Sequence, residues 1–260
     1  MKATVYSSLQ LREAFHLEFL TWLGKRVNAG HYALKGGVNL RFFFNSPRYS
    51  EDMDLDVANI RVDTLKDNVM KILRSSSFHD SLKLFGVEKV IPPDISKAKQ
   101  TETTQRFKVY LVTLSGEDLF TKVEFSRRGF SGETFVEPLT DVILRAYKMP
   151  PLLVPHYGIQ SAVTQKIGAL ATRSAVQARD VFDLYILSSQ YKSSGELGPV
   201  KSQAAKAQDN ALGISFEQFQ DTVVSYLAPE DQGVYRPAAS WDEIKLKVAH
   251  FIDEVSERNG

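Results

Sequence analysis

Cysteine is absent from this sequence of 260 residues, so the chain can form neither disulfide bonds nor thiolate metal sites. Its five histidines are scattered and show neither His-x-x-x-His nor His-Glu-x-x-His spacing, so a zinc site is not predicted. No apolar run is long enough to span a bilayer, and the first residues lack the apolar run of a signal peptide. These absences fit a protein of the reducing cytoplasm, which is the location that we expect, without membrane association.

A strong net charge is also lacking, because 32 basic residues face 31 acidic ones and the formal net charge is +1. Without a global basic field, any contact with RNA must come from a local patch. Neither a P-loop nor a GxGxxG motif is present, which leaves ATPase and dinucleotide-binding functions without support. The basic residues that could form an RNA-binding patch are Lys97, Lys99, Arg106, Arg127, Arg128, Arg173 and Arg179.

What the sequence does contain is a glycine pair, Gly36 and Gly37, followed by an acidic segment. Glycine lets the backbone turn tightly and approach a ligand closely. In an extended strand, alternation places Asp52, Asp54 and Asp56 on one face, where they repel one another unless a positive group lies between them. Magnesium suits such a place, because it prefers oxygen and binds through one or two carboxylates plus substrate phosphates. We therefore predict an Mg²⁺ site at Asp52 and Asp54, with Mn²⁺ as the alternative ion.

The order of these residues is more specific than either motif alone. Lys-Gly-Gly-x-x-Leu at residues 35–40, followed by Arg-x-Ser-x-Asp-x-Asp at residues 48–54, resembles the polymerase-β-like nucleotidyltransferases. Within them it is similar to the AbiEii family, the toxins of type IV toxin–antitoxin systems, which includes the MenT-type tRNA-modifying toxins. The alternative is a glycine turn and an acidic strand in an unrelated α/β protein. Order and spacing together favour the nucleotidyltransferase.

Hydrophobic periodicity predicts both helices and strands. Helices are expected at residues 8–28, 38–44, 64–74, 158–173 and 179–188, and strands at residues 52–58, 107–114 and 119–126, the last two as a hairpin. Ser215 and Ser240 each begin a capping-box pattern that is typical of a helix start. Residues 83–104 are expected to be irregular around Pro92 and Pro93, and residues 192–213 to form a linker or loose loop.

The pattern of elements changes near Met149, Pro150 and Pro151. We expect an α/β (α+β) protein in which residues 1–150 form a nucleotidyltransferase lobe with a mixed sheet. Residues 151–260 are expected to form a mainly helical C-terminal lobe. The family resemblance implies the same two-lobed architecture, with the active-site cleft between the lobes.

Glu124 is the candidate for a third metal ligand. Strand alternation places it on the same side as Lys122 and Ser126. In the wider superfamily that we infer from the resemblance, a third carboxylate on a neighbouring strand completes the metal site and can activate the attacking hydroxyl. The alternative is a surface glutamate paired with Lys122, and both interpretations stay open.

The helices of the C-terminal lobe contain further candidates. Lys166, followed by Arg179-Asp180-x-x-Asp183, resembles the later motifs of the family. The resemblance implies that Lys166 contacts a nucleotide phosphate and that Asp180 positions Lys166 or the base and ribose. Asp180 and Asp183 are three residues apart and so share a helix face. The alternative is a simple Arg179–Asp183 pair beside a solvated Lys166.

Arg48 and Ser50 flank the acidic strand and could bind triphosphate oxygens through a guanidinium fork and a hydroxyl. The alternative for Arg48 is a loop arginine bonded to backbone. Many members of the superfamily have a hydroxyl residue directly after the glycines, where this chain has Val38. The backbone N–H groups of Gly37 and Val38 could serve the phosphates instead.

These residues together predict a magnesium-dependent nucleotidyltransferase that moves NMP from an NTP onto an acceptor hydroxyl. The family resemblance implies a growth-arresting toxin, a tRNA 3′ end as the acceptor and a cognate antitoxin. Three alternatives stay open. They are an aminoglycoside-type nucleotidyltransferase with a small-molecule acceptor, an NTP-using kinase of the same fold, and a catalytically silent nucleotide-binding module.

Overall fold

The computed structural model describes residues 6–192 and 200–257 of the chain. The described parts of Met1–Phe43 and Tyr49–Tyr157 form one compact unit, and those of Phe44–Arg48 and Gly158–Gly260 form the other. The short segment that contains Arg48 is therefore part of the second unit, although it lies early in the sequence. No helix among the described residues is long and apolar enough to cross a membrane.

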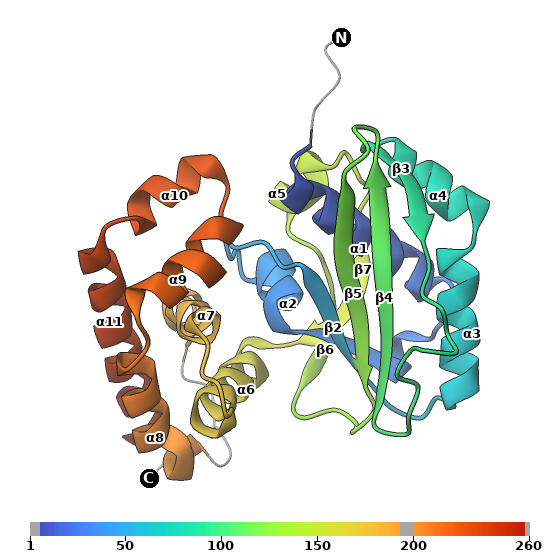
Figure 1. Ribbon diagram of the computed structural model, residues 1–260. Coiled ribbons are helices and arrows are strands. Elements are labelled where there is room, and N and C mark those ends of the chain that lie inside the picture. The colour runs from blue at the N-terminus through green and yellow to red at the C-terminus, as the bar shows by residue number, and fades with distance from the viewer. Residues whose placement is uncertain (1–5, 193–199, 258–260) are drawn as a thin grey trace. The chain divides into compact units, whose positions relative to one another are not determined.

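The first unit is built on one sheet, whose strands appear in blue to yellow-green in Figure 1. Its strands are β1 (Tyr32–Lys35), β2 (Asp52–Val57), β3 (Val87–Ile91), β4 (Thr104–Thr113), β5 (Asp118–Ser126), β6 (Thr134–Pro138) and β7 (Leu153–Tyr157). Their order across the sheet is β3-β4-β5-β2-β1-β7-β6. β2 and β5 are parallel, as are β1 and β7, whereas β4 and β5 form an antiparallel hairpin. The predicted mixed sheet is thus confirmed.

Alternation along the strands separates the core from the polar face. Phe107, Val109 and Leu111 of β4 are fully buried, and Arg106 and Lys108 lie on the opposite face. The helices of the first unit are α1 (Ser8–Gly24), the short η1 (Ala29–His31), α2 (Gly36–Phe43), α3 (Val62–Leu73), α4 (Ser76–Lys83) and α5 (Asp141–Ala146). Side chains of α1, α3 and α4 belong to the same hydrophobic core as those of β4. This core fixes the strands that carry the candidate site.

The second unit is helical in its described residues. It contains α6 (Ile159–Thr172), α7 (Ala178–Ser188), α8 (Val200–Leu212), α9 (Phe216–Thr222), the short η2 (Val224–Tyr226), α10 (Pro229–Tyr235) and α11 (Ala238–Glu257). α8 packs against α6 and α11, and α7 contacts α6, α9 and α11. The α/β class with a helical C-terminal part is therefore confirmed.

The expected loop at residues 192–213 is wrong for its larger part, because α8 begins at Val200. Residues 193–199 lie outside the described residues. Ala204, Ala207 and Ala211 recur at helical spacing and are buried. Small side chains let α8 pack closely on its neighbours, and they carry too little hydrophobicity to mark a helix in the sequence.

Two smaller expectations also fail. Residues 83–104 include β3, whose Val87 and Val90 are buried, and Pro92 follows the strand and ends it. Ser240 lies inside α11 and does not cap it. Ser215, in contrast, caps α9, because its hydroxyl accepts a hydrogen bond from the backbone N–H of Gln218.

Candidate active site

Gly36 joins β1 to α2 and has a φ of 69°, in the left-handed region that favours glycine. A Cβ atom at this position would lie 3.3 Å from Oδ2 of Asp54. Gly36 thus permits both the tight turn and the close approach of the Asp54 carboxylate. Gly37 lies in the first turn of α2, where backbone N–H groups have no partner within the helix.

The carboxylates of Asp52 and Asp54 are placed by the pairing of β2 with β5. In register, Asp52 is opposite Lys122 and Asp54 is opposite Glu124. Lys122 Nζ lies 3.0 Å from Oδ2 of Asp52. Oδ1 of Asp52 is buried and has no hydrogen-bond partner among the described residues. A buried acceptor without a donor is costly, so this oxygen is suited to a cation.

Asp54 is half-buried, and no described residue forms a hydrogen bond or ion pair with it. Burial raises the pKa of Asp54, and the neighbouring carboxylates Glu124 and Asp52 add to this effect, whereas Lys122 and Lys35 oppose it. A cation between Asp52 and Asp54 would therefore stabilise the ionised form of both.

Asp56, the third carboxylate on the same strand face, has protein partners. Its Oδ1 lies 2.5 Å from Nζ of Lys35, and its Oδ2 accepts a 2.6 Å hydrogen bond from the hydroxyl of Tyr157. Asp56 is buried and satisfied, so it acts in the structure of the sheet. The face therefore divides into two available carboxylates and one structural carboxylate.

Glu124 lies next to Asp54 on β5, but its main partner is Arg106 of β4. Arg106 Nε donates a 2.6 Å hydrogen bond to Oε2 of Glu124, whereas Lys122 Nζ is 3.8 Å from the same oxygen. In residues 6–192 and 200–257, no group of three or more His, Asp or Glu side chains is arranged to hold a metal ion. Glu124 as a third ligand stays a prediction.

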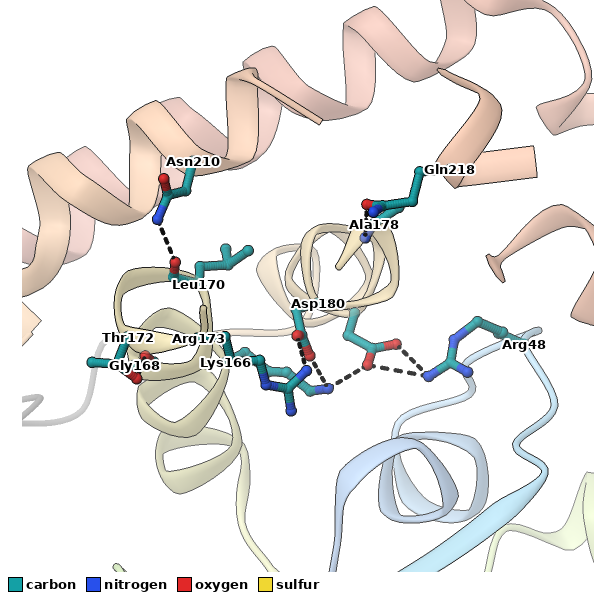
Figure 2. A network of polar contacts seen from close by, with 11 residues as sticks. Arg48, Lys166, Gly168, Leu170, Thr172, Arg173, Ala178, Asp180, Asn210 and Gln218 are labelled. Atoms are coloured by element: carbon teal, nitrogen blue, oxygen red, sulfur yellow. Dashed lines mark hydrogen bonds and ion pairs between the residues drawn. The ribbon is translucent and has the colours of Figure 1, made fainter. Parts of the chain in front are cut away.

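A second polar cluster lies in the second unit and contains the later sequence motifs (Figure 2). Lys166 of α6 places its Nζ 2.9 Å from Oδ1 of Asp180 and 2.6 Å from Oδ2 of Asp183, both on α7. Arg48 donates to both oxygens of Asp183 at 3.2 Å, and Arg173 pairs with Asp180. Three cations thus surround two carboxylates.

The ion-pair partners in this cluster offset the effect of burial on the pKa values of Lys166 and Asp183. Burial disfavours the charged ammonium of Lys166, but Asp180 and Asp183 outweigh burial and hold the pKa of Lys166 above its ordinary value. Burial alone would raise the pKa of Asp183, but Arg48 and Lys166 hold it below its ordinary value. Both shifts favour the charged forms, and the cluster contains three basic side chains against two acidic ones, which suits an anionic ligand.

The alternative of an Arg179–Asp183 pair beside a solvated Lys166 is wrong. Lys166 is buried, with an exposed fraction of 9%, and Asp183 pairs with Arg48 and Lys166. Arg179 is exposed, and no hydrogen bond or ion pair joins it to the described part of the chain. The hydroxyl of Ser50 donates a 2.8 Å hydrogen bond to the backbone oxygen of Asp52, so it supports the start of β2.

Comparisons with known proteins identify the family of the chain. The family model "Nucleotidyl transferase AbiEii toxin, Type IV TA system" matches residues 19–242. The chain belongs to the AbiEii family. This AbiEii protein is therefore a nucleotidyltransferase toxin, with an NTP as substrate and an antitoxin as the counterpart in its system.

Solved structures with the same fold include nucleotidyltransferases of two bacteria. MenT4, a nucleotidyltransferase toxin from Mycobacterium tuberculosis, is 17% identical with a TM-score of 0.62, covering 97% of this chain and 86% of its own. JHP933 from Helicobacter pylori is 18% identical with a TM-score of 0.58, covering 98% and 95%. A putative H. pylori nucleotidyltransferase is 18% identical with a TM-score of 0.56, covering 98% and 97%. No curated protein sequence matches the chain.

The AbiEii site fits a divalent metal on the observations above. Asp52 offers a buried oxygen without a donor, Asp54 has no protein partner among the described residues, and Gly36 leaves room beside it. Mg²⁺ is commonly bound by one or two protein carboxylates, while substrate phosphates and water complete its coordination shell.

One member of the second cluster and two helix contacts elsewhere in the second unit were not predicted. Arg173, considered only as an RNA contact, is an ion-pair partner of Asp180. Gln218 of α9 accepts a 3.0 Å hydrogen bond from the backbone N–H of Ala178 at the start of α7, and Asn210 of α8 donates to the backbone oxygen of Leu170 at 2.7 Å. Their partners lie on other helices, so no local sequence signal marks them.

Proposed function

We propose that this AbiEii protein transfers NMP from an NTP to the 3′ end of a tRNA in a magnesium-dependent reaction, releases pyrophosphate and so arrests growth in the cytoplasm. The metal part rests on the buried Oδ1 of Asp52 and the neighbouring carboxylate of Asp54, neither of which has a hydrogen-bond or ion-pair partner among the described residues. The choice of tRNA is supported by the resemblance to the MenT-type tRNA-modifying toxins.

In this proposal Asp52 and Asp54 bind the metal, and Glu124 is a third ligand once it leaves Arg106. The bound metal would neutralise charge on the phosphate and on the attacking oxygen. The backbone at Gly36 and Gly37 lets a phosphate approach, and Ser50 keeps β2 in place beneath it.

The second cluster has a complementary role in the proposal. Lys166 and Arg48 bind phosphate oxygens of the nucleotide with the excess positive charge of the cluster. Asp180 and Asp183 hold these two cations in position, and Arg179, exposed on α7, adds a contact to the nucleotide.

The test is incubation with total tRNA and each of the four NTPs labelled on the α-phosphate, with and without Mg²⁺. Label in RNA that is lost when the 3′ end of the tRNA is oxidised with periodate before the reaction supports the proposal. Label in an added aminoglycoside but not in tRNA would replace the acceptor by a small molecule. In a parallel reaction with NTP labelled on the γ-phosphate, transfer of the label with release of NDP would show a kinase.

A further inference from the structure

The first unit contains a cavity of about 400 Å³. None of the proposed active-site residues lines it, although Arg106, the partner of Glu124, does. Its apolar wall includes Ile91, Pro92 and the ring of Tyr110, and its basic wall includes Lys97, Lys99 and Lys108. We call this cavity, with these six residues, the β4 groove. It combines an aromatic ring with several ammonium groups, a combination that a purely structural surface does not require.

The walls of the β4 groove are held by the backbone. Pro92 follows β3 and ends its pairing with β4, after which the chain loops out and returns. The return is fixed, because the backbone N–H of Arg106 donates to the oxygen of Lys99 at 2.8 Å and Gln105 donates to Gln100 at 2.7 Å. The lysines of the loop therefore lie over β4 before any ligand is present.

The positive charge of the groove is only partly compensated. Lys97 lies 3.7 Å from Asp94, but no carboxylate of the described residues pairs with Lys99 or Lys108. Both of these lysines are exposed. Two uncompensated ammonium groups at one cavity favour a ligand with at least one phosphate.

Tyr110 gives the groove an aromatic surface. Its side chain is 45% exposed, and the ring of Phe120 supports it in an edge arrangement with centroids 5.5 Å apart. An exposed ring beside Ile91 and Pro92 can stack a nucleobase, while nearby lysines contact the phosphates on either side. This is how proteins bind single-stranded nucleic acid.

The groove lies on the same sheet face as the candidate metal ligands. Across the strands, Lys108 is opposite Lys122, which is opposite Asp52, and Lys122 pairs with Asp52. β4 and β2 are separated only by β5, a distance of about 10 Å for two strand spacings. A chain that is held at Tyr110 can therefore extend along this face to Asp52 and Asp54.

We infer that the β4 groove binds the single-stranded end of the acceptor RNA, with one base stacked on Tyr110 and flanking phosphates on Lys99 and Lys108. This binding directs the terminal hydroxyl toward Asp52 and Asp54. The inference rests on the proposed RNA acceptor, but it concerns binding and can be tested without transfer.

The experiment measures the dissociation constant of a short fluorescent single-stranded RNA by anisotropy, without NTP. Tyr110→Ala should weaken binding roughly tenfold to a hundredfold, and Tyr110→Phe should keep it, because the phenyl ring still stacks. The Lys99→Ala/Lys108→Ala protein should reduce the slope of log K against log salt by about 1.4. The matched controls are Phe135→Ala, an aromatic that is 39% exposed on β6, and Lys71→Ala, an exposed lysine on α3; neither should change binding.

The outcomes separate this inference from the proposed function. Transfer of NMP to RNA with an unchanged KM for RNA in Tyr110→Ala would overturn the groove and leave the function in place. If the wild-type protein labels no RNA with any NTP but Tyr110→Ala still loses RNA binding, the result would support the groove and overturn the proposed transfer. Equal binding of polyglutamate would overturn the inference in favour of an acidic protein partner. A weaker affinity for NTP alone in Tyr110→Ala would overturn it in favour of a nucleotide pocket.

Discussion

Asp54 and Asp56 lie on the same face of β2, but their carboxylates have different surroundings. Asp56 has two protein partners, Lys35 and Tyr157, whereas Asp54 has none among the described residues. They are the same residue type two positions apart on one strand, so the sequence pattern does not distinguish them. Their separate surroundings allow a matched comparison.

We expect Asp54→Asn and Asp52→Ala both to abolish transfer and growth inhibition. The melting temperature of Asp54→Asn without metal should hold or rise, because the change removes a carboxylate without an ion-pair partner from a crowded face. Asp56→Asn should instead lower the melting temperature, because Lys35 loses its buried partner. Thermal denaturation and the transfer assay check both effects, and substantial transfer by a folded Asp54→Asn protein would sink the metal assignment.

The pH dependence of this comparison follows from the direction of the shift. Burial raises the pKa of Asp54 above its ordinary value of 3.8, so the folded state binds the proton more tightly than the unfolded state. Stability contributed by the protonated form is then lost as the pH rises from the unfolded pKa through the folded pKa. The gain in melting temperature from Asp54→Asn should therefore be larger at neutral pH than near the ordinary pKa of Asp.

His16 is expected to make the protein sensitive to mild acid. Burial, and secondarily Arg12, lowers the pKa of His16 from 6.5 to about 3, and its Nε2 lies 3.1 Å from the hydroxyl of Thr121. Below pH 6.5, the ordinary pKa of His, His16 becomes protonated in the unfolded state but stays neutral in the folded state. Stability should therefore fall as the pH drops from 6.5 toward 3, by at most ~1.4 kcal/mol per pH unit from this group.

His16→Gln removes this titration. Urea denaturation at a series of pH values should give a flatter dependence of the unfolding free energy on pH for the variant than for the wild type. Parallel dependences in the two proteins would show that His16 is not the group responsible.

At the scale of elements, buried ion pairs join α6 to α7, because Lys166 of α6 pairs with Asp180 and Asp183 of α7. Lys166→Ala should lower stability by about 3–5 kcal/mol, because two buried carboxylates lose their shared cation. It should also reduce kcat/KM for the NTP roughly tenfold to a hundredfold. Lys201→Ala, an exposed lysine on α8, is the control and should change neither.

A charge-balanced variant separates the two effects of Lys166. Lys166→Met combined with Asp180→Asn removes one charge of each sign and leaves Asp183 paired with Arg48. This protein should regain stability but not NTP use. Recovery of both would mean that Lys166 acts only in the structure.

α8 provides a test of packing within one helix. Ala207 is fully buried, whereas Ala205 is exposed. Ala207→Leu should destabilise the protein by about 1–3 kcal/mol because the larger side chain forces α8 away from α6 and α11. Ala205→Leu should be close to neutral in urea denaturation, and equal effects of the two changes would contradict the packing of α8.

At the scale of the whole molecule, the proposed metal and nucleotide should bind together. Two carboxylates alone bind Mg²⁺ weakly, since the ion demands near-octahedral oxygen geometry that an NTP completes. The melting temperature should change little with either ligand and rise clearly with both, because ligands of the folded state stabilise it by mass action. Asp54→Asn should erase the joint rise. Calorimetry that finds NTP bound equally tightly in excess chelator would contradict the metal site.

Local patterns were sufficient for much of this protein. The glycine pair, the alternation at Asp52 and Asp54 and the later Lys166 motif are readable because turns, strand faces and helix faces repeat over a few residues. The same holds for α1, α3, α6, α7 and the β4–β5 hairpin, whose periodicity is strong. Family membership followed from the same motifs.

Contacts between distant residues were decided only in the folded chain. Arg48 pairs with Asp183 across 135 positions, and Arg106 rather than the sequence neighbour Lys122 is the close partner of Glu124. The burial of α8 depends on which helices receive its alanines, and the separation of Asp54 from Asp56 depends on Tyr157. The partner of a charge is set by strand register and helix packing, which bring together residues that share no local pattern.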